Sequence, residues 1–371
     1  MWGMKTRHVC LVTVVLLGLS LGLVGCGPTQ SSPAATAVAA LPPPPPPPPP
    51  PADWTLVQLP DTQYYSESYP KHWAAISTWI VDNVEAENIK FVVNVGDITN
   101  DNSERQWTVA RENLEPIMAA VPTALTTGNH DYGRGPGPAG RGTRFEQFFP
   151  PEEFLAQPTA GALYSPDSMA SSYQTFSVNG QDWLILSLEF GPRDEVVDWA
   201  NQVLAEHPNH AVILNTHAYL TNQGPRLDQH NKRFGHNPHK YPMAKTAGGV
   251  NDGEELWQKL VQPNPNVVLV LSGHVSGVNR RVDENAHGNE VHQVVANYQS
   301  ETEGGNGYIR LLRFSADGTR IDVRSYSPVL DREKKVAQNN FTLDLTHTFL
   351  WAGKEPPVLQ DDAAAELEPA A

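Results

Sequence analysis

Cysteine is scarce in this sequence of 371 residues. Its two cysteines, Cys10 and Cys26, both lie near the N-terminus. Cys10 falls in a segment that is expected to be removed, so the mature chain would keep a single thiol. A disulfide within that chain is then excluded. If the remaining thiol, that of Cys26, is covalently modified, no free thiol is left to oxidise. Such a chain suits export.

Positive charge is also in short supply. Lys and Arg number 26 against 41 Asp and Glu, which gives a formal net charge of −15 at pH 7. A surface of this sign repels nucleic acid and anionic membranes over long range, so no nucleic-acid binding is expected. An anionic ligand would need a local source of positive charge, and a buried cluster of divalent cations is the simplest one.

The hydrophobic stretch Val9–Val24 is short for a membrane-spanning helix that stays in place. A basic start, this stretch and the small residues at its end are typical of a secretory signal, predicted here at residues 1–25. Cys26 follows Leu-Val-Gly and resembles the bacterial lipobox, in which this cysteine carries a lipid. The resemblance implies an exported protein, anchored to the bacterial cell envelope by its N-terminal lipid on the periplasmic or outer side. An ordinary signal peptide is the alternative.

Three segments follow the signal. Residues 26–51 are a predicted tether, because Pro42–Pro51 is a run of ten prolines that favours polyproline II. We interpret the run as a spacer, with a docking site for a proline-binding module as the alternative. Residues 52–354 are long enough for one large α/β domain. Residues 355–371 are acidic and lack a hydrophobic pattern, which predicts a disordered tail.

Within the domain, five apolar segments of strand length are each followed by acidic, amide or imidazole side chains. Ligands bind at the carboxyl ends of strands in open α/β sheets, so these side chains are expected to converge on one crevice. The segments and the residues that follow them are 54–59 with Asp61, 89–95 with Asp97, 123–127 with Asn129 and His130, 211–215 with His217, and 267–271 with His274.

The rest of the domain has the pattern of a mixed α/β fold, with amphipathic spacing for helices and apolar runs for strands. Helices are expected at 73–84, 103–117 (with Ser103 as N-cap), 195–206 and 254–261. A hairpin of 172–178 and 182–189 is expected to turn at Asn179-Gly180, and further strands at 290–298, 308–314, 320–326 and 341–345. Residues 132–167 are rich in Gly and Pro and are predicted to form a long surface loop.

Several short motifs stand at the strand ends: Asp61-Thr62-Gln63, Gly96-Asp97-Ile98-Thr99-Asn100, Gly128-Asn129-His130-Asp131, Thr216-His217 and Gly273-His274. In order and spacing they resemble the signature of the calcineurin-like metallophosphoesterases. The resemblance covers most of the domain. It implies a four-layer α/β-β/α sandwich. It also implies metal-dependent hydrolysis of phosphate mono- or diesters by a hydroxide bound at a two-metal centre, with a small phosphate ester as the partner.

The same resemblance implies a role for each motif residue. Two divalent ions are expected, with Mn, Fe, Mg and Zn all open. Asp97 would bridge them, Asp61 and Gln63 would hold the first metal, and Asn129, His217 and His274 would hold the second. His130 would point at the substrate, since adjacent side chains diverge and Asn129 is the ligand. It would steady the developing charge and protonate the leaving group.

Two positions depart from the family pattern. The first motif is commonly Asp-x-His, and here Gln63 replaces the imidazole. The last is commonly Gly-His-x-His, and here Ser276 stands at the second imidazole. Both missing imidazoles belong to the first metal, which keeps oxygen ligands only and so favours Mn²⁺ or Mg²⁺ over Zn²⁺. The resulting hypothesis is that the first site binds its metal more weakly and is filled only when substrate is present. His287 or His292 could instead replace the missing imidazole as a ligand.

The segment Gln223–Tyr241 is the most basic part of this acidic chain. Two interpretations are open for it, a rim that binds the substrate phosphate and a solvated loop. A second hypothesis for the whole protein is a catalytically silent, metal-containing binding protein tethered at the envelope, which the lost imidazoles suggest. The retained His130 argues against it, because binding alone needs no acid for a leaving group.

Overall fold

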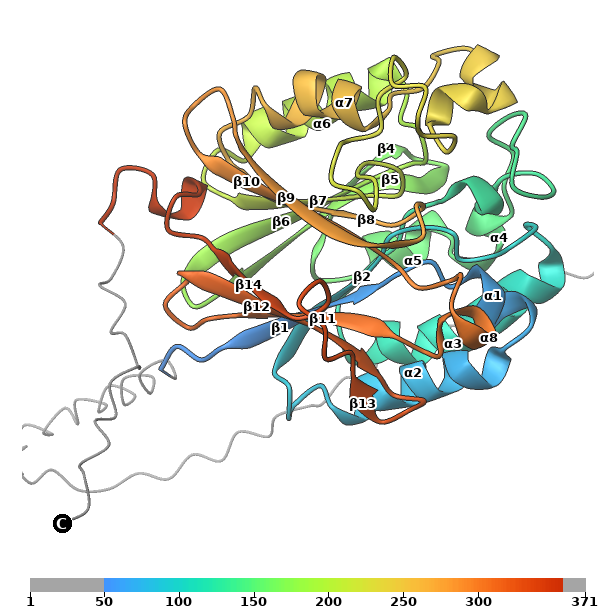
Figure 1. The fold of residues 1–371 in the computed structure, drawn as a ribbon, viewed down its shortest axis with the longest axis horizontal. Coiled ribbons are helices and arrows are strands. Elements are labelled where there is room, and N and C mark those ends of the chain that lie inside the picture. The colour runs from blue at the N-terminus through green and yellow to red at the C-terminus, as the bar shows by residue number, and fades with distance from the viewer. Residues whose placement is uncertain (1–49, 356–371) are drawn as a thin grey trace, which may run out of the picture. The chain divides into compact units, whose positions relative to one another are not determined.

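The computed structural model describes residues 50–355 (Figure 1). The predicted signal segment, the predicted lipidation site Cys26, most of the tether and the acidic tail lie outside the described residues and stay predictions. Among the helices of residues 50–355, none is long and apolar enough to cross a membrane.

Two seven-stranded sheets form the centre of the domain. In the first, the order is β13-β12-β11-β1-β2-β3, and β14 pairs with β12. The strands β1, β2 and β3 run parallel, whereas β11 and β12 are antiparallel to their neighbours. The bounds are β1 (Trp54–Leu59), β2 (Ile89–Asn94), β3 (Thr123–Ala124), β11 (Ile309–Phe314), β12 (Arg320–Ser327), β13 (Arg332–Glu333) and β14 (Phe341–Asp344).

The second sheet has the order β4-β5-β6-β7-β8-β10-β9. Its central strands β6, β7, β8 and β10 are parallel. The predicted hairpin is β5–β6, and its turn residues Asn179 and Gly180 both have positive φ, as a tight hairpin turn requires. The bounds are β4 (Ala160–Ser165), β5 (Ser168–Val178), β6 (Gln181–Leu188), β7 (Ala211–Thr216), β8 (Val267–Ser272), β9 (Gly277–Glu284) and β10 (Glu290–Asn297).

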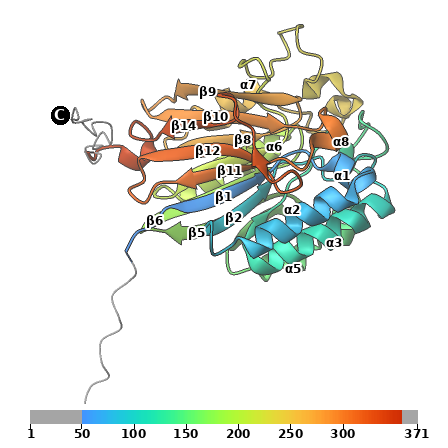
Figure 2. The same cartoon turned by 60° about the horizontal axis from the view of Figure 1, so that its bottom comes forward.

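Helices cover the outer face of each sheet (Figures 1 and 2). The helices α2 and α3 pack on the first sheet, and α6 and α7 pack on the second. The resulting order, helix, sheet, sheet and helix, is the predicted four-layer α/β-β/α sandwich, and the prediction is confirmed. The helices are α1 (Gln63–Glu67), α2 (Pro70–Asp82), α3 (Glu104–Ala120), α6 (Asp194–Glu206), α7 (Gly253–Leu256, continued by a π-helical turn at Trp257–Val261) and α8 (Thr302–Gly305).

The central strands β1 and β2 carry apolar residues on both faces because both faces are buried. Successive side chains of a strand point to opposite sides. On β1, Leu56 therefore packs between the sheets and Val57 under the helices, and Phe91 and Val92 divide in the same way on β2. The apolar inter-sheet layer holds the two sheets face to face, which brings their strand ends to a common edge.

Parts of the sequence-based assignment were wrong. Residues 132–167 are not one loop, because they contain α4 (Phe145–Phe148), α5 (Pro151–Leu155) and β4. Phe145 is buried and stacks on Trp107 of α3, so packing orders these short turns. Strand β9 was not predicted. The helix after Ser103 begins where expected, but the Ser103 hydroxyl makes no capping hydrogen bond.

Candidate metal centre

The five predicted strand ends lie together at one edge of the sandwich. Asp61, Asp97 and Asn129 follow strands of the first sheet. His217 and His274 follow β7 and β8 of the second. The crevice is therefore formed jointly by both sheets, and all five side chains are buried in it.

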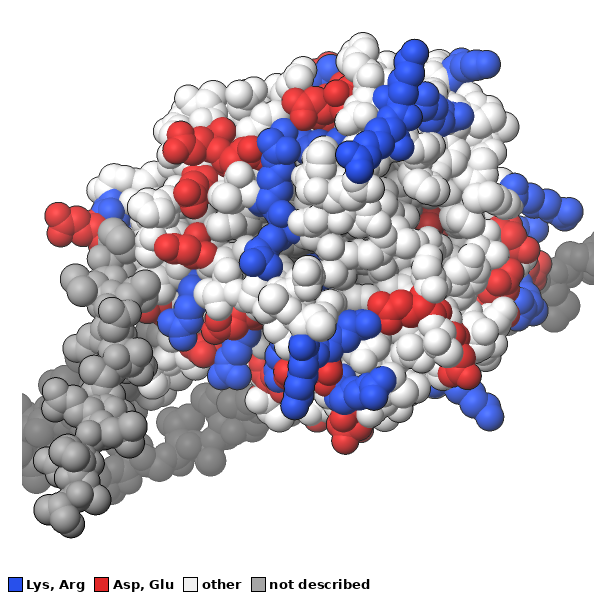
Figure 3. Space-filling model, viewed as in Figure 1, with Lys and Arg blue, Asp and Glu red and all other residues white. Residues whose placement is uncertain are grey.

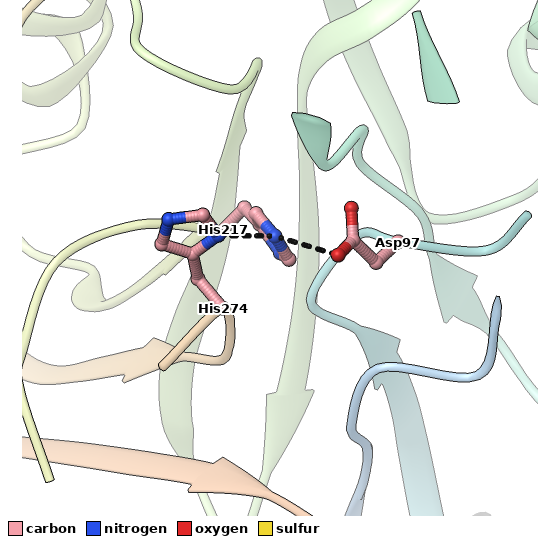
Figure 4. Close-up of side chains that lie close together, drawn as sticks. All are labelled: Asp97, His217 and His274. Carbon is pink, nitrogen blue, oxygen red and sulfur yellow. Dashed lines mark hydrogen bonds and ion pairs between the residues drawn. The ribbon is translucent and has the colours of Figure 1, made fainter. Parts of the chain in front are cut away.

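The Nε2 atom of His217 has three other potential ligand atoms around it, and the four atoms together form a ring of donors. It is 3.2 Å from Asn129 Oδ1, 3.2 Å from His274 Nδ1 and 3.3 Å from Asp97 Oδ2. Figure 4 shows His217 between His274 and the Asp97 carboxylate. Metal bonds of about 2.0–2.2 Å hold neighbouring donors about 3.0–3.4 Å apart. The observed spacing is thus that of donors around one ion.

Backbone carbonyls fix which atom each of these side chains turns toward the ring. The Nδ1 of His217 is 2.8 Å from Val95 O, and the Nε2 of His274 is 2.6 Å from His236 O. Each carbonyl fixes a proton on the nitrogen that it contacts, so the other nitrogen of each imidazole is the one that can bind a metal ion. Asn129 donates from Nδ2 to Pro136 O at 2.9 Å, so its carbonyl oxygen faces inward.

Backbone conformation aims two of these side chains. Asp97 and His274 both have positive φ, 50° and 65°, which non-glycine residues seldom adopt. Gly128, before Asn129, and Gly273, before His274, leave room for carboxylates, since a Cβ there would lie 2.1 Å from Asp97 Oδ1 and 2.2 Å from Asp61 Oδ2. They are glycines because carboxylates occupy the space.

The residues predicted for the first metal lie next to this ring. Asp61 accepts a hydrogen bond from the backbone N of His274 at 3.0 Å, and its Oδ1 is 3.9 Å from His217 Nε2. Gln63 is buried and donates from Nε2 to Asp97 Oδ2 at 3.2 Å. The Oε1 atom of Gln63 is buried without a hydrogen-bond partner in residues 50–355. Such an orphaned acceptor fits the role of a metal ligand.

The two alternative histidines are not at this site. His287 bonds Pro263 O at 2.9 Å in the β9–β10 turn. His292 bonds Asp344 O at 2.6 Å near the start of β10, at the other end of the strand from the crevice. Ser276 pairs its hydroxyl with Ser300 at 2.7 Å. Neither histidine therefore substitutes for the missing imidazole.

Burial and mutual interaction shift every ionisable group of the cluster. Burial raises the pKa of Asp61 to about 7 and lowers the pKa of His274 to about 3. Burial opposes charge on Asp97 and His217 too, but their mutual attraction prevails. It holds the pKa of Asp97 below its usual range and raises the pKa of His217 to about 9. Without metal, the Asp97 carboxylate is thus paired with a protonated His217, whose Nε2 proton a bound metal ion would displace.

His130 lies beside the ring but faces the open space. Its backbone N donates to Asp97 Oδ1 at 2.9 Å, and its Nδ1 is 2.7 Å from Asn100 O. The carbonyl partner assigns the proton to Nδ1 and leaves Nε2 for a ligand. As expected from its position after Asn129, the His130 side chain lines the cleft above the cluster.

The cleft over the cluster has a volume of about 400 Å³. Part of the basic segment forms its wall, and basic side chains gather in Figure 3 over the region where Figure 1 draws that segment in yellow. Arg233 and His236 of this segment line the cleft, whereas Arg226 is buried and pairs with Asp283 at 2.6 Å. The segment is therefore not a wholly solvated loop, and phosphate binding by its cleft side stays a prediction. The cleft is lined by Asp97, Asn129, His130, Pro136, Asn222, Gln223, Arg233, Phe234, Gly235, His236, Tyr241, His274, Val275, Ser276 and Gln299.

Other features of the fold do not make a second site of this kind. His239, Asp252 and Glu255 also lie close together, but Asp252 and Glu255 form the capping box of α7 and His239 pairs with Glu255 at 2.6 Å. A separate cavity of about 300 Å³ lies at the opposite end of β1, beneath Trp54 and Trp183, and none of the predicted site residues lines it.

Asp131 is a site residue to which the sequence reasoning assigned no role. Its fully buried carboxylate accepts hydrogen bonds from Thr99 N at 2.8 Å, Ile98 N at 3.1 Å and Gly128 N at 2.8 Å. Burial, with repulsion from Asp97, raises the pKa of Asp131 to about 6. Asp131 ties the loop after β2 to the loop after β3. Its place at the end of the Gly-Asn-His-Asp motif was the available signal.

Replacing Asp131 with alanine should destabilise the domain. Three buried N–H groups would lose their acceptor, which we expect to lower the free energy of unfolding by about 3 kcal/mol or more. Urea denaturation in the presence of a chelator measures this change without a contribution from metal. Asp198→Ala, at an exposed position of α6, is the control and should change stability by less than about 0.5 kcal/mol. Equal midpoints for both variants would contradict the role given to Asp131.

The protein belongs to the calcineurin-like phosphoesterase family, whose sequence profile matches residues 55–276. The match spans all six predicted ligands and His130. The clustered residues Asp97, His217 and His274 all lie within the matched region.

Among individual relatives, the uncharacterized protein YvnB of Bacillus subtilis (strain 168) is 35% identical over 283 residues. The alignment covers 74% of this chain and 20% of YvnB, so this chain spans about a fifth of that relative's length. Two solved structures are similar at lower identity. A purple acid phosphatase, PPD1 of yellow lupin, has a TM-score of 0.48 at 15% identity, covering 79% of this chain and 54% of that one. The NAD nucleotidase NadN of Haemophilus influenzae has a TM-score of 0.40 at 12% identity, and the match covers 81% of this chain and 52% of NadN.

Proposed function

We propose that this protein hydrolyses phosphate mono- or diesters with two divalent metal ions held in the crevice. The observation that carries the proposal is the ring of donors around His217 Nε2, in which Asp97, Asn129 and His274 each present a lone pair at 3.2–3.3 Å. Bound divalent ions would place positive charge next to the phosphoryl oxygens and would lower the pKa of a coordinated water towards neutrality.

The two ligand sets differ in chemistry. The second set combines Asn129, His217 and His274 with the shared Asp97, and two imidazoles suit Zn²⁺, Fe or Mn²⁺. The first set contains Asp61, Gln63 and Asp97, which offer oxygen alone and favour Mn²⁺ or Mg²⁺. We propose that the first site is the weaker of the two.

Other residues of the cleft would act on the substrate. His130 is placed to donate a proton from Nε2 to the leaving oxygen, while its Nδ1–H bond to Asn100 O fixes the orientation of the imidazole. Arg233 lies on the cleft wall and can attract the anionic ester into an otherwise acidic protein. The volume of about 400 Å³ fits a small ester. Attachment to the cell envelope through Cys26 is part of the proposal and rests on the sequence alone.

Removing metal should abolish turnover. We expect a chelator to reduce hydrolysis of p-nitrophenyl phosphate and of bis(p-nitrophenyl) phosphate to the uncatalysed rate. Added Mn²⁺ should restore hydrolysis, because the donors around His217 would bind metal again. The faster of the two substrates identifies the protein as a mono- or diesterase. Metal analysis of the purified protein accompanies the assay.

Two results would contradict the proposal. Absence of turnover with Mn²⁺, Mg²⁺, Fe²⁺ and Zn²⁺ would favour the alternative, a silent metal-containing binding protein. Two tightly held zinc ions per chain would contradict the weak, oxygen-rich first site while leaving the hydrolase proposal intact.

A further inference from the structure

Gln299 lies at the crevice although it belongs to none of the motifs described above. The strand that leads to it, β10, runs parallel to β8. Gln299 stands two residues beyond the end of β10 at Asn297, as His274 stands two residues beyond the end of β8 at Ser272. It lines the cleft together with Asp97 and His274. A sixth strand end therefore contributes a polar side chain to the crevice.

The side chain of Gln299 meets the first metal site through Gln63. The Nε2 atom of Gln63 donates to Asp97 Oδ2 and to Gln299 Oε1. The Oε1 atom of Gln63 has no partner in the part of the chain that the structure describes. The NH2 group of Gln63 thus donates to two oxygens while the carbonyl of the same amide is orphaned. This arrangement places a hydrogen-bond donor where a cation would attract the same two oxygens.

Turning the Gln63 amide over makes all three groups acceptors. The nitrogen and oxygen of a glutamine are assigned from the hydrogen-bond network, so their order follows what occupies the site. With a cation present, the Oε1 atoms of Gln63 and Gln299 and the Oδ2 of Asp97 would converge on it. The orphaned carbonyl of Gln63 would then also be satisfied.

The position of the missing imidazole supports this assignment. The Ser276 hydroxyl bonds that of Ser300, the residue next to Gln299, at 2.7 Å. The loop is held in place by Asn297, which accepts from Gln299 N at 2.8 Å and donates to His274 O at 3.1 Å. The loop that carries Gln299 is thus fastened to the segment that carries His274.

We propose that Gln299 is a ligand of the first metal site and takes the place of the imidazole that Ser276 lacks. This inference rests on the proposed function only in that metal binds in the crevice. The first site then has four oxygen ligands, from Asp61, Gln63, Asp97 and Gln299. Two of them are neutral amides, which makes the site selective for Mn²⁺ or Mg²⁺ and weaker than the histidine-rich site.

Metal binding tests the assignment without an activity readout. Equilibrium dialysis against Mn²⁺, followed by metal analysis, gives the affinity of each site, and electron paramagnetic resonance tells a spin-coupled pair from an isolated ion. For the wild type we expect two ions per chain and a coupled signal. Gln299→Ala should weaken the weaker site by about tenfold or more and leave the tighter site unchanged, so that an isolated ion dominates. Gln299→Glu should retain both ions and bind the weaker one more tightly, because a carboxylate replaces a neutral amide ligand. An unchanged affinity of the weaker site in Gln299→Glu would count against the assignment.

The control is Thr302→Ala, which alters an exposed residue three positions beyond Gln299 and should bind metal as the wild type does. Thermal unfolding of the metal-free variants checks the fold, and Gln299→Glu carries the test if the alanine variant does not fold. Two unchanged affinities in Gln299→Ala overturn the inference, as does a wild type that binds one ion at every Mn²⁺ concentration. A wild type that binds no divalent ion overturns the proposed function as well. Metal binding without turnover overturns only the hydrolase.

Discussion

Replacing Asp97 with asparagine or alanine is expected to reduce phosphoester hydrolysis to the uncatalysed rate. Asp97 contacts Gln63, His130 and His217, so it lies between both ligand sets. Each bound ion contributes several kcal/mol to stabilising the transition state. At tenfold per 1.36 kcal/mol, losing this stabilisation lowers kcat/KM by at least about 10⁴-fold.

The asparagine variant separates a catalytic effect from a folding defect. The amide introduced by Asp97→Asn would keep one carbonyl oxygen for the backbone N of His130, so this variant should stay folded even if the alanine variant does not. The matched control is Asp101→Asn, four residues further along the same loop, where the carboxylate accepts from Ser103 N. Initial rates with saturating Mn²⁺ and thermal unfolding without metal are the measurements. Turnover of Asp97→Asn within tenfold of the wild type would exclude Asp97 as the shared ligand.

The effect of His130→Ala should depend on the leaving group. A general acid contributes about 10²–10⁴-fold, and it matters when the departing oxygen needs a proton. We expect a loss of this size in kcat for alkyl phosphate esters. For p-nitrophenyl esters, whose leaving group is stable without a proton, the loss should be less than about tenfold. Metal content should not change, because the ring around His217 is intact.

His230→Ala is the matched control for this experiment, since His230 lies exposed in the basic segment. Its kinetics should equal those of the wild type on both substrate classes. An equal loss on alkyl and p-nitrophenyl esters would mean that His130 binds the phosphoryl group but does not protonate the leaving oxygen. A loss of bound metal in His130→Ala would instead mean that the imidazole is a ligand.

The fold was predictable where residue pattern and burial agree. Continuous apolar runs such as 89–95 predicted buried strands, and the residues that follow them meet in the crevice because parallel strands end at one edge. Residues 132–167 were misjudged because Gly and Pro dominate 133–142, and the short helices after them have too few residues to show a helical period. Their order comes from contacts such as that of Phe145 with Trp107.

The site was predictable only as far as its motifs extend. Asn129, His217 and His274 could be read from the order of the motifs. Gln299 could not, because a glutamine after a strand is usually an ordinary surface residue. Its importance depends on the pairing of β10 with β8 and on the orphaned carbonyl of Gln63, and both arise from contacts between distant segments. Asp131 likewise acts through three backbone N–H groups that no local pattern specifies.

The two sheets contribute to the metal centre from opposite sides of the inter-sheet core, Asp97 from one and His217 with His274 from the other. An ion held by all three would be a cross-link that closes a long loop in the chain. Metal-binding free energy at such a point is folding free energy, because the unfolded chain has no preformed site. Since residues 50–355 contain no cysteine, this cross-link would take the part that a disulfide plays in disulfide-bonded domains.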